Sequence, residues 1–244
     1  MRFAGIIPAR YGSSRFPGKP LCDIDGLPMI VRVCRRVARW DKWTSLHVAT
    51  DDERIIKECK EQGIPAIMTD VNHSDCLDRA NEAAQILGGA HHADRIVIIQ
   101  GDEPLFEVET LDVDLSPPIV NFYTEVRDER ELYSPDSVKV VVSRFERALY
   151  FSRYTLPFHE MRTRRDKELP LRVLKQIGVY SFTPSLLAVY AELEPTYLEQ
   201  MEGIGLLRLL ENEIDIDMRH TEYDSVSVDT EDDRTAVEKI IRGG

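Results

Sequence analysis

A loop near the N-terminus carries residue types suited to binding an anion. It spans residues 8–21 and includes two glycines, two serines and three cations: Arg10, Arg15 and Lys19. Glycine lets backbone N–H groups approach an anion closely, and such a loop after a strand is typical of phosphate-binding turns. It is not a Walker A loop, since five residues separate Gly12 from Gly18 and Pro20 follows the lysine. The pattern predicts a phosphate site, the alternative being a surface turn rich in glycine and proline.

Two aspartates are candidates for holding a divalent cation beside this loop. Asp102 lies in the turn at residues 100–104, directly after an apolar stretch, and Asp229 ends the alternating run at 226–228. Mg²⁺ prefers one or two carboxylates, with phosphate and water oxygens completing its coordination. The alternatives are an ordinary turn for Asp102 and a helix-capping turn for Asp229, with Thr230 as the cap.

The remaining polar motifs point to an acid-binding arginine and to no other catalytic group. Arg153 follows two aromatic residues, and arginine binds carboxylates through two parallel hydrogen bonds. The alternative for Arg153 is a surface ion pair. His73 and Cys76 have no further soft ligands in a metal-binding spacing, and no local motif predicts a serine, cysteine or histidine nucleophile.

The elements that position these residues alternate between strand and helix. Strands are predicted at 3–8, 45–50, 65–69, 95–100, 137–143, 148–153 and 177–182, and helices at 27–40, 53–62, 78–87, 184–192, 197–212 and after 230. The segment 105–136 is expected to be irregular. Apolar strands alternating with helices predict an α/β protein with a parallel sheet covered on both faces. Ligands then bind at the carboxyl ends of the strands, where residues 8–21 and 100–104 fall.

Composition narrows the possible partners. The 244 residues include 31 Lys and Arg against 43 Asp and Glu, a formal net charge of −12. So acidic a chain argues against binding to nucleic acid or to anionic membranes. No apolar run approaches the roughly 20 residues that span a bilayer, and no signal peptide is apparent, so we expect a cytoplasmic protein. The four cysteines are scattered, which predicts reduced thiols.

Seven short segments together resemble the 3-deoxy-manno-octulosonate cytidylyltransferase (CMP-Kdo synthetase) family over nearly the whole chain. They lie at residues 7–21, 48–55, 100–104, 138–142, 148–153, 177–180 and 228–233. The resemblance implies one domain, 1–244, with a Rossmann-like nucleotidyltransferase fold: a mostly parallel central sheet and a small antiparallel acceptor and dimerisation subdomain. Within it, residues 1–104 would bind CTP, about 138–212 would bind the acceptor and dimerise, and 213–244 would return to the metal site.

The resemblance also implies a reaction and a set of site residues. CMP passes from CTP to an acidic acceptor, pyrophosphate leaves, Mg²⁺ assists, and the enzyme is a homodimer. The implied catalytic residues are Arg10, Lys19 and Asp102, and the implied Mg²⁺ ligands are Asp102 and Asp229. The implied nucleotide-binding residues are Pro8, Ala9, Arg10, Tyr11, Gly12, Ser13, Ser14, Lys19, Arg79 and Asp102. The implied acceptor-binding residues are Gln100, Arg153, Gln176 and Tyr180.

Three departures from the family pattern concern the acceptor side. Residues 75–77 replace a Ser-Gly-Thr motif, Gln176 replaces a histidine, and Gly205-Leu206 replaces a Glu-Gln pair. The connection at 105–136 is also several residues short. A pocket that loses hydrogen-bonding groups discriminates against its former ligand, because unpaired polar groups are costly to bury. We therefore expect 3-deoxy-manno-octulosonate or a modified relative as the acceptor, the alternative being a small phosphonate such as phosphonoformate.

Two other functions compete with this hypothesis. One is a non-catalytic nucleotide-binding homologue, which the presence of Arg10, Lys19, Asp102 and Asp229 argues against. The other is a sugar-1-phosphate nucleotidyltransferase that uses another base.

Overall fold

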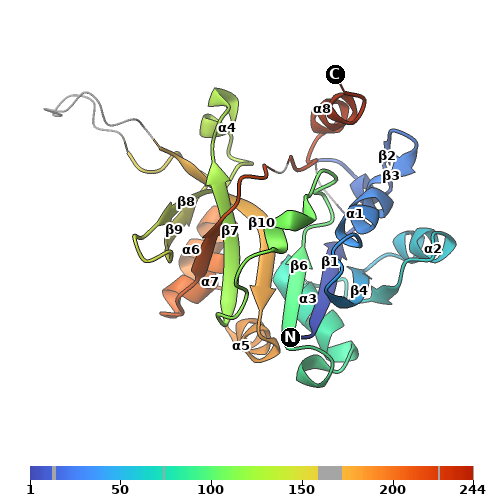
Figure 1. Cartoon of the computed structure of the whole chain (residues 1–244), viewed down its shortest axis with the longest axis horizontal. Helices are drawn as coiled ribbons and strands as arrows, with labels where there is room; N and C mark the ends of the chain where they lie inside the picture. The colour runs from blue at the N-terminus through green and yellow to red at the C-terminus, as the bar shows by residue number, and fades with distance from the viewer. Residues whose placement is uncertain (13–14, 74, 159–171, 225, 244) are drawn as a thin grey trace, which may run out of the picture. The chain divides into compact units, whose positions relative to one another are not determined.

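A computed structural model describes residues 1–12, 15–73, 75–158, 172–224 and 226–243, which form two compact units (Figure 1). The first unit comprises Met1–Val120, Gly178–Leu193 and Tyr223–Gly244, and the second comprises Asn121–Ile177 and Glu194–Glu222. The predicted division of one domain into parts at 1–104, 138–212 and 213–244 stays a prediction. Among the described residues, no helix has the length and apolar character needed to cross a membrane.

A mostly parallel sheet forms the core of the first unit. Strand β1 (Phe3–Ala9) pairs in parallel with β4 (Trp43–Thr50) and β6 (Arg95–Ile99), and β5 (Ala66–Met68) pairs in parallel with β4. Residues 179–182 of β10 (Leu174–Phe182) pair antiparallel with β6. All five residues of β6 are buried, as an apolar strand in the middle of a covered sheet requires. The predicted α/β fold with a mostly parallel sheet is confirmed.

Helices follow the strands of this sheet. They are α1 (Met29–Val37), α2 (Glu53–Glu61), α3 (Cys76–Ile86), α5 (Pro184–Glu192) and α8 (Glu231–Ile241), with short 3₁₀ turns η1 (Lys19–Leu21), η2 (Gly89–His91) and η3 (Val108–Leu111). A small hairpin, β2 (Asp23–Ile24) and β3 (Leu27–Pro28), precedes α1, so this helix starts later than predicted. Asp52, Asp75 and Thr230 cap α2, α3 and α8 by accepting backbone N–H groups.

The second unit is built around antiparallel strands. It contains β8 (Lys139–Val142), β9 (Ala148–Ser152), β11 (Asp217–His220), α4 (Glu129–Tyr133), α6 (Tyr197–Glu202) and α7 (Leu206–Glu211), with most of β7 (Ile119–Glu125). Strand β8 pairs antiparallel with β9 and with the first part of β10. The prediction of one helix over 197–212 is wrong, because Gly203 adopts a left-handed conformation (φ +64°) that ends α6.

The expectation that 105–136 is irregular is also wrong in part. Residues 119–125 form strand β7, and six of its seven residues are buried. Two prolines precede it, which is compatible with a strand because Pro118 stands before the first paired residue. The carbonyl oxygen of Pro118 accepts the N–H of Thr183 at 2.8 Å. Four of the five residues at 119–123 are β-branched or aromatic, which is the sequence signal for this strand.

Gly101 joins the turn after β6 to the end of β1, and this contact is testable. Its N–H donates to the carbonyl oxygen of Pro8 at 3.2 Å, and a Cβ atom at Gly101 would stand 2.7 Å from that oxygen. We expect Gly101→Ala to lower the free energy of unfolding by about 1–3 kcal/mol, the usual range for overpacking. Gly12→Ala is the matched control, because its Cβ would meet no atom of the described, non-adjacent residues within 4 Å. Urea denaturation curves for both variants measure the difference, and equal curves would contradict the expectation.

Candidate functional site

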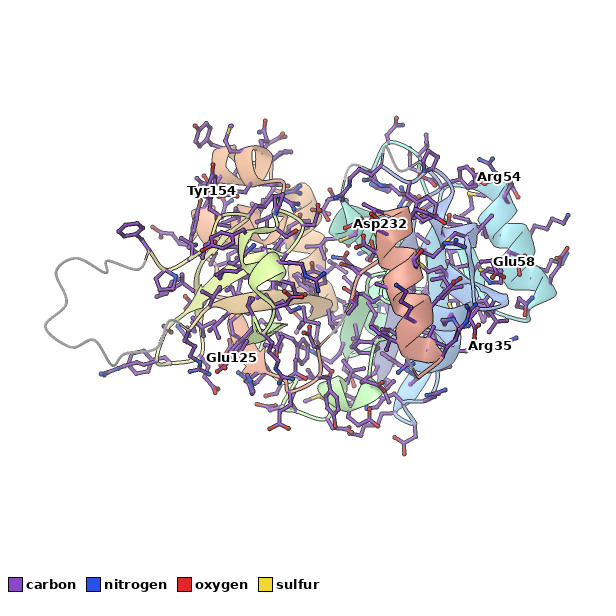
Figure 2. All side chains as sticks on the ribbon, turned by 90° about the horizontal axis from the view of Figure 1, so that it is seen from above. Arg35, Arg54, Glu58, Glu125, Tyr154 and Asp232 are labelled. Atoms are coloured by element: carbon purple, nitrogen blue, oxygen red, sulfur yellow. The ribbon has the colours of Figure 1, made fainter. Side chains whose placement is uncertain are left out.

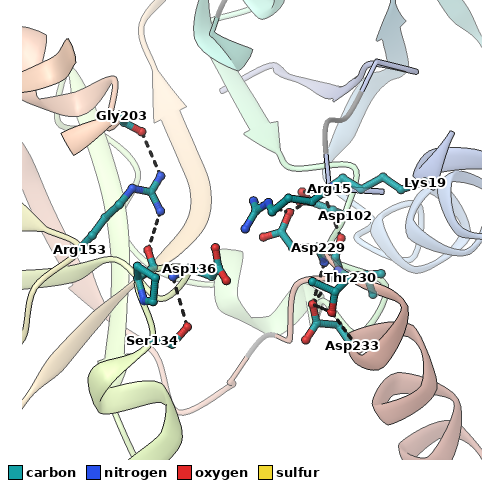
Figure 3. Close-up of polar contacts among 12 residues, drawn as sticks. Arg15, Lys19, Asp102, Ser134, Asp136, Arg153, Gly203, Asp229, Thr230 and Asp233 are labelled. Atoms are coloured by element: carbon teal, nitrogen blue, oxygen red, sulfur yellow. Dashed lines mark hydrogen bonds and ion pairs between the residues drawn. The ribbon is translucent and has the colours of Figure 1, made fainter. Parts of the chain in front are cut away.

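Three segments far apart in the chain meet at the side chain of Lys19 (Figure 3). Its ammonium nitrogen Nζ donates to Asp102 Oδ2 at 2.7 Å, to Asp229 Oδ1 at 2.8 Å and to the carbonyl oxygen of Val228 at 3.1 Å. These aspartates lie 83 and 210 residues after the lysine. The structure therefore brings together the loop at residues 8–21, the turn after β6 and the segment before α8, as the predicted site requires.

The Lys19 ammonium group keeps its positive charge beside the two aspartates. Its side chain is only 12% exposed. Burial alone would lower the pKa of Lys19, but the carboxylates of Asp102 and Asp229 outweigh this effect and raise the pKa above its usual value. Lys19 is thus protonated at neutral pH.

The backbone around Asp229 is fixed by the capping box of α8. One carboxylate oxygen of Asp233, Oδ2, accepts the N–H groups of Asp229 at 3.1 Å and of Thr230 at 2.8 Å. The hydroxyl oxygen of Thr230 accepts the N–H of Asp233 at 3.3 Å, which completes the box. Arg15 contacts the same Asp229 oxygen as Lys19, at 3.1 Å. A Thr-x-x-Asp sequence is readable as a capping box, and Asp233 is a site residue that sequence reasoning missed.

The carboxylate of Asp102 has one oxygen atom that is suited to bind a metal ion. The carbonyl oxygen of Asp102 accepts the N–H of Val228 at 2.9 Å, so the backbone is held on both sides of the turn. Its second carboxylate oxygen, Oδ1, is buried and has no hydrogen-bond partner in the described part of the chain. Buried carboxylate oxygens normally have a partner, so an additional cation fits here. No group of three or more His, Cys, Asp and Glu side chains gathers as a metal site in the described ranges. The ion would need substrate or water oxygens, which suits Mg²⁺.

A hollow of about 350 Å³ lies beside the first residues of the loop at 8–21. It is lined by Arg10, Tyr11, Gly12, Asp51, Asp52, Arg54, Val71 and His73. The guanidinium carbon of Arg54, on α2 (Figure 2), lies 3.3 Å from the centre of the Tyr11 ring. Pro8 and Ala9, two further predicted nucleotide-binding residues, are buried at the end of β1. The predicted residues Ser13 and Ser14 lie outside the described residues.

Gly18 makes the sharp turn that leads into Lys19. Its N–H donates to the carbonyl oxygen of Tyr11 at 3.0 Å, and its φ of +73° favours glycine. A Cβ atom here would also stand 2.9 Å from the Tyr11 ring. The Tyr11 ring thus packs against the guanidinium of Arg54 and leaves no room for a side chain at position 18.

Arg79 is a buried residue that contacts Asp51, one of the residues lining the hollow. Its side chain is 3% exposed, and it donates to Asp51 Oδ2 at 2.9 Å and to Thr69 Oγ1 at 2.7 Å. Asp51 stands directly after β4 and lines the hollow. A role of Arg79 in nucleotide binding stays a prediction, and its contacts in the structure position Asp51.

Two predicted acceptor-binding residues contact each other in the first unit. Gln100 Nε2 donates to the hydroxyl oxygen of Tyr180 at 3.1 Å. Burial raises the pKa of Tyr180 well above its usual value, and the neighbouring groups of Cys76 and Asp75 add to the effect. Tyr180 therefore remains a neutral phenol over the physiological pH range and acts as a hydrogen-bonding group.

Arg153, in the second unit, is held by backbone carbonyl groups. Its Nε donates to the carbonyl oxygen of Glu202 at 2.6 Å. Its two terminal nitrogens donate to those of Pro135 at 2.6 Å and Gly203 at 3.2 Å, and Figure 3 shows the contact with Gly203. Glu202 also accepts the backbone N–H of Arg153 at 3.0 Å. Among the described residues no carboxylate contacts the guanidinium. The guanidinium has five N–H groups and makes three contacts with carbonyl groups, so N–H groups remain for other acceptors. The surface ion pair considered above is thus absent from the described contacts.

The positions that depart from the family pattern have different surroundings. Nε2 of Gln176 is buried and has no hydrogen-bond partner in the described part of the second unit. Gly205 precedes the first turn of α7, and Leu206 is 1% exposed in the apolar core. Leu206 therefore supplies packing, and its side chain has no polar atom to offer a ligand. Glu202, which sequence reasoning missed, accepts the Ser152 hydroxyl at 2.8 Å.

Comparisons with known proteins identify relatives of this chain in sequence and in structure. Residues 4–216 match the family model described as cytidylyltransferase. The chain is 39% identical to the 3-deoxy-manno-octulosonate cytidylyltransferase of Desulfosudis oleivorans over 99% of this chain and 98% of that protein. It is 41% identical to the enzyme of the same name from Nitratidesulfovibrio vulgaris over 98% and 95%. A solved structure of CMP:2-keto-3-deoxy-manno-octonic acid synthetase, complexed with CTP, superposes with a TM-score of 0.86 at 33% identity, covering 100% and 99% of the two chains.

The capping box before α8 generates a prediction about local stability. Asp233→Ala removes the acceptor of two N–H groups, and a lost cap of this kind costs about 1 kcal/mol of unfolding free energy. Asp232→Ala is the matched control, because Asp232 is an exposed acidic residue in the same first turn (Figure 2). Thermal unfolding of the two variants separates the cap from the general effect of negative charge near a helix N-terminus. Equal melting temperatures would contradict the assigned role of Asp233.

Proposed function

The chain belongs to the 3-deoxy-manno-octulosonate cytidylyltransferase family, and from this we propose that it transfers CMP from CTP to an acidic sugar with release of pyrophosphate. The acceptor we propose is 3-deoxy-manno-octulosonate or a modified relative of it. The observation that carries the proposal is the convergence of Lys19, Asp102 and Asp229 at the carboxyl ends of the strands. We also propose that the enzyme is a homodimer and acts in the cytoplasm.

The chemistry of the proposed reaction suits this set of residues. Transfer of a phosphoryl-type group needs positioning and stabilisation of negative charge more than a covalent catalyst. Arg10 and the backbone of the loop would bind the nucleotide, and Lys19 would neutralise charge that develops on the phosphates. The oxygen of the acceptor hydroxyl forms the new bond to the α-phosphorus as the bond to pyrophosphate breaks, and the hydroxyl proton passes to water.

Asp102 and Asp229 are the residues we propose to hold Mg²⁺. The unpartnered Oδ1 atom of Asp102 supports this assignment, as does the closeness of both carboxylates to one ammonium group. When bound, the ion would supply positive charge beside the phosphate oxygens. Asp233 and the turn at Gly101 would keep the two carboxylates in place.

On the acceptor side we propose roles for Gln100, Arg153, Gln176 and Tyr180. The guanidinium of Arg153 keeps N–H groups beyond its three carbonyl contacts, and these suit a carboxylate. The buried, unpartnered amide nitrogen of Gln176 is a further donor. Because Leu206 is an apolar core residue, the Glu-Gln pair of the family pattern has no substitute at these positions. This observation favours a modified acceptor, and it keeps a small phosphonate as the second candidate.

Pyrophosphate release is the direct test of the reaction. We expect turnover with CTP, Mg²⁺ and either 3-deoxy-manno-octulosonate or one of its modified relatives, and little with UTP. The acceptor panel should include derivatives altered at single hydroxyl groups and phosphonoformate. Asp102→Asn should abolish turnover, because it removes a proposed metal ligand while keeping the side chain's size.

The panel also separates the candidates from one another. Turnover with phosphonoformate alone would replace the sugar proposal, and efficient turnover with unmodified 3-deoxy-manno-octulosonate would remove the case for an altered acceptor. Faster turnover with UTP than with CTP would indicate a different base preference and count against the cytidylyl reaction.

Arg153→Lys tests the proposed contact with the acceptor. Lysine keeps the charge but lacks the planar fork, so it should lose at least one charge-assisted hydrogen bond, worth about 1.5–3 kcal/mol or roughly tenfold or more in affinity. We expect the KM for the acceptor to rise by that factor and the KM for CTP to change by less than about twofold.

The matched control is Arg147→Lys in the same unit, where an exposed arginine contacts Asp215. This variant should change neither KM. If Arg153→Lys raised both KM values equally, the arginine would have a structural role rather than a role in acceptor binding.

A further inference from the structure

We propose that Lys19 is the resident counter-ion of Asp102 and Asp229 in the ligand-free enzyme, and that a divalent cation displaces it from these carboxylates toward the triphosphate. This inference rests on the proposed function, since it concerns the same metal and nucleotide. It adds an exchange between two cations. Lys19 competes with the metal for the two carboxylates and then binds the phosphates of the nucleotide.

The hydrogen-bonding capacity of Lys19 is the first argument. An ammonium group has three N–H donors, and Lys19 directs them at Asp102, Asp229 and the carbonyl oxygen of Val228. A lysine bound in this way has no donor left for a phosphate oxygen. Contact with the triphosphate therefore requires that Lys19 give up at least one of these three contacts.

Charge supplies the second argument. The two carboxylates carry two negative charges, and Lys19 and Arg15 already bring two positive charges to them. A divalent cation on the same carboxylates would stand within a few ångströms of the ammonium group, where like charges repel strongly in a partly buried site. Full occupancy of the carboxylates by both cations is thus disfavoured, and binding of one weakens binding of the other.

A route for the exchange is visible at Asp102. Lys19 contacts Oδ2 of this residue, whereas Oδ1 is buried and has no described partner. An incoming cation can bind Oδ1 while Lys19 still holds Oδ2, so the carboxylate does not have to be left uncompensated. The lysine then moves by side-chain rotation alone, because Gly18 and the η1 turn keep its backbone in place.

One thermodynamic consequence distinguishes this exchange from a fixed ion pair. If Lys19 competes with the metal, removal of its charge must strengthen metal binding in the absence of nucleotide. If the lysine only supports the carboxylates structurally, its removal must weaken metal binding. The sign of the change therefore decides between the two roles.

The experiment titrates Mn²⁺ alone against the nucleotide-free protein and follows the free ion by electron paramagnetic resonance. We expect Lys19→Met and Lys19→Gln to bind Mn²⁺ at least fivefold more tightly than the unaltered protein. Lys19→Arg keeps the positive charge and should stay within twofold. Lys57→Met is the matched control, because it removes a lysine charge from an exposed site on α2 in the same unit. Asp102→Asn should abolish the binding and so locates it.

Unchanged or weaker Mn²⁺ binding in Lys19→Gln would overturn the inference, as would equal tightening in Lys19→Arg or in Lys57→Met. The glutamine variant is decisive because it keeps amide N–H groups for the aspartates, and circular dichroism verifies that it is folded. These measurements use no CTP, so they are independent of the turnover assay. Tightening without turnover would leave the exchange standing and refute the proposed function, whereas turnover without tightening would refute the exchange alone.

Discussion

The ion triad of Lys19, Asp102 and Asp229 is the interaction on which the proposed site depends. Each of its members belongs to a different segment, and none of these segments would hold its charge in that place without the others. Burying a single unpaired charge is costly, so the lysine and the two aspartates stabilise one another there. The loop after β1, the turn after β6 and the start of α8 are thereby joined at one edge of the sheet.

The supports of this triad come mainly from the backbone. Gly101 approaches the carbonyl oxygen of Pro8 at a distance that no side chain permits, and Asp233 holds the N–H groups that precede α8. Gly18 turns the loop so that Lys19 begins the η1 turn. In each case a glycine or a helix cap determines the backbone conformation, and the backbone then determines where the neighbouring charged side chain lies. This division lets the charged side chains change partners while the scaffold around them stays in place.

The parts of the site that were readable from the sequence are those that depend on local pattern. The glycine-rich loop and Asp102 follow apolar strands, and the carboxyl ends of parallel strands are where such residues meet. Asp229 is ambiguous in the sequence, because only the tertiary structure brings the segment before α8 to Lys19. The ion pair between buried Arg79 and Asp51 is not predictable from the sequence, since the sequence does not show whether an arginine is buried or exposed. Strand β7 is not predictable in the same way, because two prolines directly precede its run of mainly apolar and aromatic residues and favour an irregular segment.

If Arg153 binds the acceptor as proposed, its contacts have a consequence for how acceptor preference can diverge among related enzymes. Its guanidinium is directed by the carbonyl oxygens of Pro135, Glu202 and Gly203, and a point substitution does not remove a carbonyl group. Most single substitutions around the arginine therefore leave its hydrogen bonds in place. The arginine is exposed instead to changes that shift the backbone, such as an insertion or deletion in the turn at 134–137 or at the glycine that ends α6. Length variation in these two turns is thus the evolutionary variable to follow in this family, more than the identity of the residues that face the arginine.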